Sequence, residues 1–165
     1  MGRRSLGILL ALAMSGAAAA EWTLGPDGFG PMRIGMTFEE AREVAGPALQ
    51  PTDPALLASE ECDQVALPGR PGVALMFVGG VLHRIDVFRP GVRTAAGVGP
   101  GDPVAKVEQA YPGLARMPNR YDGSEEYLTV GPRQGRALRF ETLKGKVDRA
   151  YAGDWEQVQY VEGCL

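Results

Sequence analysis

The sequence predicts an α+β fold in which two tandem repeats, each a short helix plus an antiparallel sheet, share one core. Two short amphipathic segments carry helix start and stop signals, and each precedes short apolar runs separated by tight glycine turns. The second set follows the first at an offset of about 66 residues. We therefore expect one domain at residues 21–165, with repeats at about 21–92 and 93–165 and the short helices packed on one sheet face.

Residues 1–20 have the three parts of a secretory signal peptide. Arg3 and Arg4 give a basic start, residues 6–14 are apolar, and Ala18 and Ala20 supply the small residues that signal peptidase requires. The apolar run is too short to cross a bilayer core of ~30 Å as a helix. We expect cleavage near Ala20-Glu21, a periplasmic or secreted location and no transmembrane segment in the mature chain.

The mature chain is mildly acidic and long enough for one core. Cleavage removes two of the 17 basic residues and no acidic one, so 15 remain beside 20 acidic residues, a balance of −5. Such a chain without basic runs is not expected to bind nucleic acid through charge.

The chain has two cysteines, Cys62 and Cys164. In an oxidising compartment two cysteines usually pair, and the chain-entropy model assigns roughly 4–5 kcal/mol to a loop of this length. The alternative is a reactive redox pair. A structural disulfide is the favoured interpretation, because no Cys-x-x-Cys spacing or nearby helix start supports reactivity.

The first helix is expected to begin at Thr37. This residue forms a capping box with Glu40, in which each side chain accepts a hydrogen bond from the other residue's backbone N–H. The helix should run to Ala45 and stop at Gly46-Pro47. Its apolar positions follow the spacing i, i+3, i+6, i+7 of one helix face: Phe38, Ala41, Val44 and Ala45.

The second helix is expected to use Asp102 as its N-cap and Pro103 as its first residue, and to stop at Pro112-Gly113. Its apolar residues have the same spacing as those of the first helix: Val104, Val107, Ala110 and Tyr111. The matching spacing supports a duplicated unit.

The strand candidates recur in the same way. Each half contains a hairpin, residues 73–77 with 80–85 in the first and 137–140 with 145–150 in the second. Further strands are expected at residues 64–67 and 126–130, with a closing strand at 157–161. One unit alone buries too little apolar area to fold, so the two should share a core.

The segment around the first helix resembles a known family. Residues 32–41, which read Met-Arg-Ile-Gly-Met-Thr-Phe-Glu-Glu-Ala, followed by Gly46-Pro47, are similar to the opening GMT-x-x-E-[VA]…G-x-P of one superfamily. It includes the SmpA/OmlA outer-membrane assembly lipoproteins and the β-lactamase inhibitor protein. The resemblance implies a short helical element ahead of an antiparallel sheet, in two tandem copies in the inhibitor. The chain departs from these relatives by lacking a lipid-attachment cysteine and by having one cysteine pair instead of one per half. Inhibition of β-lactamase is therefore not carried over.

The residue inventory argues against most catalytic sites. The mature chain has one histidine, His83, and two serines, Ser59 and Ser124, neither of them in a Gly-x-Ser-x-Gly turn. We expect no metal site and no cofactor, because neither a histidine cluster nor a phosphate- or dinucleotide-binding glycine pattern is present.

Residues 83–86 supply the one arrangement with a chemical hypothesis. Strand alternation places Arg84 and Asp86 on one face and His83 on the other. Arg149 is the counterpart of Arg84 in the second repeat. In one interpretation both arginines line a shared groove and bind a carboxylate or phosphate. The preferred interpretation is that both are solvated on the exposed face of the sheet. His83 is expected to be an exposed or hydrogen-bonded strand residue.

Two further segments have alternative interpretations. The acidic stretch at 121–127 is either a calcium loop or a solvated hairpin tip, and the tip is favoured because the calcium-loop spacing is missing. The aromatics Tyr151, Trp155 and Tyr160 either anchor an interface or pack in the core, and core packing is favoured.

Two functional hypotheses follow. The first is an exported, non-enzymatic binding protein whose partner is an envelope or periplasmic protein, with a surface that includes Arg84, Asp86, Arg149 and Trp155. The second is a small hydrolase or transferase of the cell envelope, built on carboxylates and arginines. A deep pocket where both arginines meet an acid of raised pKa would favour the enzyme, and an open sheet bearing an apolar or aromatic patch would favour binding.

Overall fold

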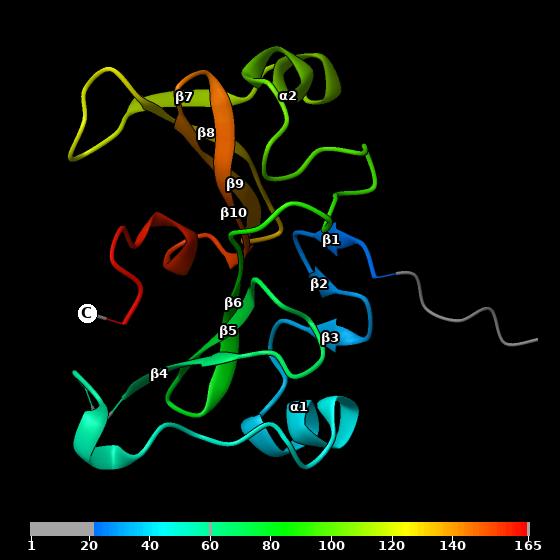
Figure 1. The fold of residues 1–165 in the computed structure, drawn as a ribbon, viewed down its shortest axis with the longest axis vertical. Helices are drawn as coiled ribbons and strands as arrows, with labels where there is room; N and C mark the ends of the chain where they lie inside the picture. Colours follow the sequence, from blue (N-terminus) through cyan, green and yellow to red (C-terminus); the bar gives the residue numbers. More distant parts are fainter. Residues whose placement is uncertain (1–21, 60, 165) are drawn as a thin grey trace, which may run out of the picture.

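The computed structural model describes residues 22–59 and 61–164, and the predicted signal peptide lies outside these residues. A seven-stranded antiparallel sheet forms the middle layer (Figure 1). The two helices and a small three-stranded sheet lie on one side of it, and the C-terminal segment lies on the other. The predicted α+β class is confirmed. No helix among the described residues is long and apolar enough to cross a bilayer.

The large sheet has the strand order β4-β5-β6-β10-β9-β8-β7. Its strands are β4 (Cys62–Ala66), β5 (Val73–Val78), β6 (Val81–Val87), β7 (Ala115–Pro118), β8 (Glu126–Arg133), β9 (Arg136–Leu143) and β10 (Lys146–Asp154). Consecutive strands pair within each half, and the last strands of the two halves, β6 and β10, pair in the middle. The sheet is therefore continuous across both halves.

The small sheet comprises β1 (Leu24–Gly25), β2 (Gly28–Phe29) and β3 (Met32–Arg33). It was not predicted, because strands of two residues show no periodic pattern. Its apolar side chains Leu24, Phe29 and Met32 are buried in the main core. The small sheet thus closes the core at the side that the helices leave uncovered (Figure 1).

Helix α1 (Phe38–Ala45) has the predicted boundaries and cap. The Thr37 backbone N–H donates to a Glu40 carboxylate oxygen over 2.8 Å, and the Glu40 N–H donates to Thr37 Oγ1 over 3.3 Å. This hydrogen bonding to Thr37 lowers the pKa of the Glu40 carboxyl. The capping-box prediction is confirmed.

Helix α2 (Val104–Ala110) ends where predicted but does not begin as predicted. Its N-cap is Pro103, and Asp102 makes no capping hydrogen bond. The Val104 N–H, which a cap would satisfy, donates instead to the Gly145 carbonyl over 3.1 Å. The Asp102 carboxylate is free to accept from the Gly99 N–H (3.0 Å) and Lys106 Nζ (3.2 Å), so it fixes the preceding loop.

Both helices are tied to the hairpin of their own half in the same way. The Leu82 N–H donates to Met36 O and the Val147 N–H to Asp102 O, both over 2.8 Å. Each hairpin also turns through two residues of positive φ, at Gly79-Gly80 and Lys144-Gly145. Each then has an unpaired residue shortly after the turn, His83 or Asp148. The duplication itself stays a prediction, and these matched contacts support it.

The core lies between the large sheet and the helical layer. Ala41 of α1 and Val107 of α2 are fully buried. The rings of Phe38 and Phe77 lie 4.9 Å apart, and those of Tyr111 and Phe140 lie 5.8 Å apart. The predicted helix faces therefore cover the sheet face that carries Phe77 and Phe140, except that Val44, which was expected on the buried face, is 39% exposed.

The predicted closing strand at residues 157–161 is wrong. Residues Gln157–Gln159 form a 3-10 helix, η2, and the chain continues across the open sheet face to Cys164. No strand position is free beside β10, because β6 and β9 occupy both of its edges. We refer to residues 157–164 as the tail. A second 3-10 helix, η1 (Pro54–Leu56), precedes β4.

Candidate functional site

The candidate site lies on the sheet face opposite the helices, which we call the polar face. Alternation along β6 directs Ile85 and Val87 into the core and Arg84 and Asp86 to the polar face, as predicted. Their cross-strand neighbour Tyr151 is on the same face, and its ring lies 4.7 Å from the Arg84 guanidinium carbon. The tail crosses this face (Figure 1).

Arg84 and Asp86 form a two-point ion pair. Arg84 Nε donates to Asp86 Oδ1 over 2.6 Å, and Nη2 donates to Oδ2 over 2.9 Å. Arg84 Nη1 donates to the tail carbonyls of Gln157 (2.9 Å) and Tyr160 (2.8 Å), while Gln64 also donates to Asp86 Oδ2. The pair thus joins β6, β4 and the tail in one hydrogen-bond network.

The preferred interpretation of Arg84 as a solvated arginine is wrong. Its residue surface is 2% exposed, because the tail covers it. Burial raises the pKa of the Asp86 carboxyl, and the charge and hydrogen bonds of Arg84 oppose this rise. Arg149, by contrast, keeps 55% of its side chain exposed and contacts Asp148 over 3.3 Å, as the solvated interpretation predicts.

A cavity of about 740 Å³ on one side of the tail brings three of the predicted surface residues together. We call it the Arg149 cavity. Arg84 and Asp86 line it beside Arg149. Phe88, which is 45% exposed, and the buried Tyr151 also line it.

Trp155, the fourth predicted surface residue, does not line this cavity. It is 39% exposed beyond the end of β10, where its backbone N–H donates to the Gly135 carbonyl over 2.8 Å. Core packing was favoured for the three C-terminal aromatics. It holds for Tyr151, which is 4% exposed, but Trp155 and Tyr160 are both exposed.

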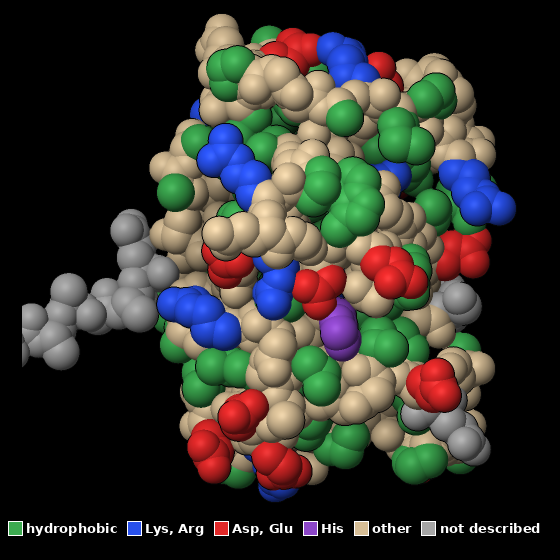
Figure 2. Space-filling view, turned by 180° about the vertical axis from the view of Figure 1, so that it is seen from behind, with side chains coloured by type: hydrophobic (Ala, Val, Ile, Leu, Met, Phe, Trp, Pro, Cys, Tyr) green, Lys and Arg blue, Asp and Glu red, His purple; other side chains and the backbone are tan. Residues whose placement is uncertain are grey.

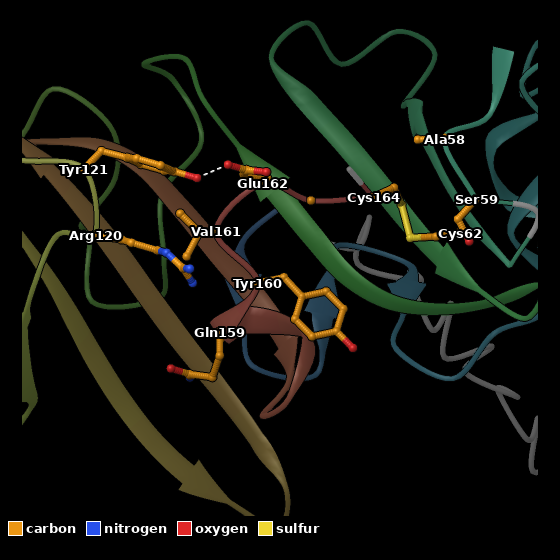
Figure 3. Close-up of a pocket in the computed structure, with 11 residues that line it drawn as sticks. Ala58, Ser59, Cys62, Arg120, Tyr121, Gln159, Tyr160, Val161, Glu162 and Cys164 are labelled. Atoms are coloured by element: carbon orange, nitrogen blue, oxygen red, sulfur yellow. Dashed lines mark hydrogen bonds between the residues drawn. A yellow bond between two sulfur atoms is a disulfide. The ribbon is translucent and has the colours of Figure 1, made fainter.

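A second cavity, of about 560 Å³, lies on the other side of the tail. We call it the Arg120 cavity. Figure 3 shows Arg120 and Tyr121 at one end, the Cys62–Cys164 bridge at the other and Tyr160 between them. The Tyr121 hydroxyl donates to the Glu162 carboxylate at its rim. The tail segment Val161–Gly163 lines both cavities.

The predicted disulfide is confirmed. Cys62 and Cys164 are bonded, with Cα atoms 5.4 Å apart, and the bridge holds the tail to β4. No free cysteine is present among the described residues. A structural disulfide between residues 102 positions apart indicates an oxidising compartment.

Residues 121–125 of the acidic stretch lie in the tip of the β7–β8 hairpin, the interpretation that the sequence favoured, whereas residues 126 and 127 begin β8 and Tyr127 is buried. Asn119 N–H donates to Glu125 O over 2.8 Å, which closes the turn. The Asp122 carboxylate accepts from Ser124 Oγ (2.6 Å) and N–H (2.9 Å), and these bonds lower its pKa. No group of three metal-ligating side chains occurs among residues 22–59 and 61–164.

His83 is satisfied by hydrogen bonding, as predicted. Its Nδ1 lies 2.6 Å from Asp154 Oδ2, and Arg136 Nε lies 2.8 Å from Asp154 Oδ1. Figure 2 shows the histidine, in purple, beside acidic side chains at the surface. The position is the unpaired one in the β5–β6 register, so His83 points neither into the core nor into the cavities.

The sequence did not single out two polar side chains under the tail, Arg139 of β9 and Gln159 of η2. Arg139 is 4% exposed, and its Nη1 donates to Gln159 Oε1 and, over 3.4 Å, to Val158 O. Its position between Leu138 and Phe140 indicates the polar face, but no local pattern indicates that the tail buries it.

Comparison with known proteins leaves the family open. The resemblance to the SmpA/OmlA and β-lactamase-inhibitor superfamily therefore stays a prediction. No family model, no curated protein and no solved structure matches this chain.

Proposed function

We propose that the chain is exported through a signal peptide at residues 1–20 and acts in the periplasm or outside the cell as a non-enzymatic, protein-binding module. The disulfide supports an oxidising compartment, since such bridges persist there and not in the reducing cytoplasm. The basic, apolar and small-residue regions of residues 1–20 support the export route.

The observation that carries the binding role is the pairing of an exposed aromatic with an exposed arginine at the Arg149 cavity. Phe88 and Arg149 both line it and both face solvent. Aromatic and arginine side chains dominate the energetic centres of protein interfaces. The buried Arg84–Asp86 pair beneath them fixes the cavity floor, so a partner would meet a pre-organised surface.

Capture from a periplasmic extract with the mature protein as bait tests this role. Phe88→Asp and Arg149→Glu should lose a partner that the wild type retains, because they place negative charge at the proposed contact. Leu143→Asp and Arg133→Glu are the matched controls, since Leu143 is exposed to the same degree as Phe88 and neither control lines the cavity. A partner that both cavity variants retain, or no reproducible partner, contradicts the proposal.

Amino-terminal sequencing of the protein recovered from the periplasm tests the export route separately. We expect the mature chain to begin at Glu21. A chain that is recovered from the cytoplasm and retains Met1 contradicts it.

One observation favours the alternative, a carboxylate- and arginine-based hydrolase or transferase. Arg84, Arg149 and Asp86, whose pKa burial raises, all line the same cavity. Both Asp86 oxygens, however, already accept hydrogen bonds from Arg84 or Gln64. This arrangement leaves Asp86 poorly placed to exchange a proton with a substrate, and so we rank catalysis second.

A screen of generic ester, phosphoester and glycoside substrates tests the alternative. If it holds, the wild type turns over one of these classes and Asp86→Asn abolishes the turnover while the far-UV circular dichroism is unchanged. Absence of turnover by the wild type rules against a hydrolase of these three classes.

A further inference from the structure

Arg139 is a buried cation that has no counterion among residues 22–59 and 61–164. Only 4% of its surface is exposed, and no carboxylate of the described residues lies within 4.0 Å of its guanidinium nitrogens. Its nearest polar contacts are neutral, the Gln159 side-chain oxygen and the Val158 carbonyl. The Tyr127 ring lies 3.9 Å from its guanidinium carbon. Burial lowers the pKa of Arg139, as expected where desolvation is not balanced by an ion pair.

Arg84, also buried, differs from Arg139 because its charge is fully compensated. Arg84 has a carboxylate on two of its nitrogens and backbone carbonyls on the third. For Arg139, the closest candidate is Glu141, two residues along the same strand. Its oxygens instead accept from Asn119 Nδ2 (3.0 Å) and the Tyr151 hydroxyl (2.6 Å). A buried charge without a partner is unfavourable, so the difference between these two arginines requires an explanation.

Unsatisfied hydrogen-bond donors gather around Arg139. Its own Nε and the Nε2 of Gln159 are buried and make no hydrogen bond within the described part of the chain. Gln159 is the direct hydrogen-bond partner of Arg139, so the two free donors belong to adjoining side chains. The hydroxyl of Thr129, opposite Arg139 on β8, is also without a partner there. An acceptor with two oxygen atoms would satisfy both nitrogen donors at once.

The Arg120 cavity reaches this cluster at Gln159, the hydrogen-bond partner of Arg139; Arg139 itself does not line the cavity. Gln159, the last residue of η2, lines the cavity, and Arg120 lines it from the loop between β7 and β8. Figure 3 shows the Arg120 guanidinium directed between Val161 and Gln159. Arg120 makes no ion pair or side-chain hydrogen bond with residues 22–59 or 61–164. Among the described residues that line the cavity, Glu162 has the only side-chain carboxylate, and it accepts from the Tyr121 hydroxyl.

The remainder of the cavity is suited to an apolar body. Toward the Cys62–Cys164 bridge, where the cavity ends, its walls are Ala58 and Tyr160 with the small hydroxyl of Ser59, whereas Val161 lies beside Arg120. Its volume, about 560 Å³, lies within the range of small-molecule sites. The charged end and the apolar end are therefore separated along the cavity.

We propose that the Arg120 cavity binds an organic carboxylate, with the carboxylate held by Arg120, Gln159 and Arg139 and the apolar body along Tyr160 toward the disulfide. The carboxylate accepts hydrogen bonds from the free Nε of Arg139 and the free Nε2 of Gln159. A small free acid and the C-terminus of a peptide share this chemistry. The inference deepens the proposed binding role but uses the opposite side of the tail from Phe88 and Arg149.

Isothermal titration calorimetry of the disulfide-bonded mature protein tests the site with two probes, 4-phenylbutanoate for a free acid and N-acetylphenylalanine for a peptide C-terminus. At least one probe should bind, and its neutral amide should bind at least about tenfold more weakly, because charge-assisted hydrogen bonds are lost. The preferred probe identifies the source of the carboxylate. Binding of neither probe, equal binding of acid and amide, or tighter binding of inorganic phosphate than of both acids overturns the proposal.

Two substitutions locate the contact. Arg139→Met keeps an unbranched apolar stem without the guanidinium, and Arg120→Ala removes the cation lining the cavity. Each should weaken the bound probe at least about tenfold, whereas Arg133→Ala, an exposed arginine outside the cavity, should leave it unchanged. Affinity that survives both Arg139→Met and Arg120→Ala overturns the site.

Nuclear magnetic resonance of the unsubstituted protein provides a measurement that does not depend on the folding of a variant. The Arg139 Nε–H resonance should shift on titration with the bound probe, and the Arg84 Nε–H should not, because Arg84 is already paired. A shift confined to other arginines overturns the assignment. Loss of the captured partner in Phe88→Asp with probe binding intact would separate this site from the protein-binding surface.

Discussion

Arg84 and Asp86 lie two residues apart on β6, and the guanidinium of one holds both carboxylate oxygens of the other beneath the tail. Two parallel hydrogen bonds from the guanidinium to the carboxylate fix the orientation of the pair. The third guanidinium nitrogen, Nη1, donates to the tail carbonyls. The pair therefore fixes residues 157–160 over the sheet, directly before the segment Val161–Gly163 that lines both cavities.

Removal of one partner of this pair should be far more harmful than removal of both. Arg84→Met leaves the Asp86 charge buried and unpaired, and should lower the free energy of unfolding by about 3–5 kcal/mol. Arg84→Met with Asp86→Leu should recover most of this loss, because no charge then remains. Urea unfolding measures both. The exposed pair Glu39–Arg42, 3.8 Å apart, is the control, and Glu39→Ala should change stability by about 0–1 kcal/mol.

The disulfide should stabilise the fold and hold the tail in place. Cys62→Ala with Cys164→Ala opens a loop of 102 residues and should lower the free energy of unfolding by about 2–5 kcal/mol. Hydrogen exchange should increase first within residues 157–164, because the bridge anchors that segment to β4. Ellman titration of the denatured, unreduced wild type should detect no thiol, and two free thiols would contradict the bridge.

Asp102 should make the free energy of unfolding depend on pH in the acidic range. Burial alone would raise the pKa of this carboxyl, but the Gly99 N–H, Lys106 and Arg93 lower it below 3.8. A carboxyl with a lowered folded-state pKa stabilises the fold above its unfolded pKa, and the contribution disappears as the pH falls through the folded value. Asp102→Asn should cost roughly 1–3 kcal/mol at pH 7 and progressively less toward pH 2. Chemical unfolding across this range measures the difference, and Asp27→Asn, at an exposed site without an ion pair in the described chain, is the control and should change stability by less than about 0.5 kcal/mol at pH 7.

Gly153 allows β10 to approach β6. Its φ is +149°, and a Cβ there would lie 2.1 Å from the His83 carbonyl oxygen. Gly153→Ala should therefore separate the two central strands and destabilise the protein by more than about 1 kcal/mol. Gly123→Ala, where a Cβ meets nothing within 4 Å, should stay within about 0.5 kcal/mol of the wild type. Equal thermal stability of the two variants would contradict this role.

The features that the sequence predicts well are local ones. The capping box at Thr37 and the hairpin turns at Gly79-Gly80 and Lys144-Gly145 depend on residues within one turn of each other, and the structure confirms them. Asp102 shows the limit of such reasoning. Asp102 is a favourable N-cap residue, but the Val104 N–H that it would cap donates to the carbonyl of Gly145, which belongs to a distant hairpin.

The candidate site depends on long-range contacts, and for that reason the sequence predicted it only in part. Alternation correctly places Arg84 and Asp86 on the polar face with Arg149. It does not predict their burial, because the covering carbonyls come from Gln157 and Tyr160, more than 70 residues later. The same tail buries Arg139, which in the sequence is an ordinary charged residue between two apolar ones.

The central position of β10 also constrains the order in which the protein can assemble. β10 is the last strand along the chain, yet it separates β6 from β9. Until it inserts, β6 and β9 each present an unpaired edge that favours intermolecular association. A chain that emerges from a translocation pore amino-terminus first would expose the β6 edge until residues 146–154 arrive. Protection by a chaperone during this interval would therefore benefit this topology more than a simple meander, in which each strand covers the one before it.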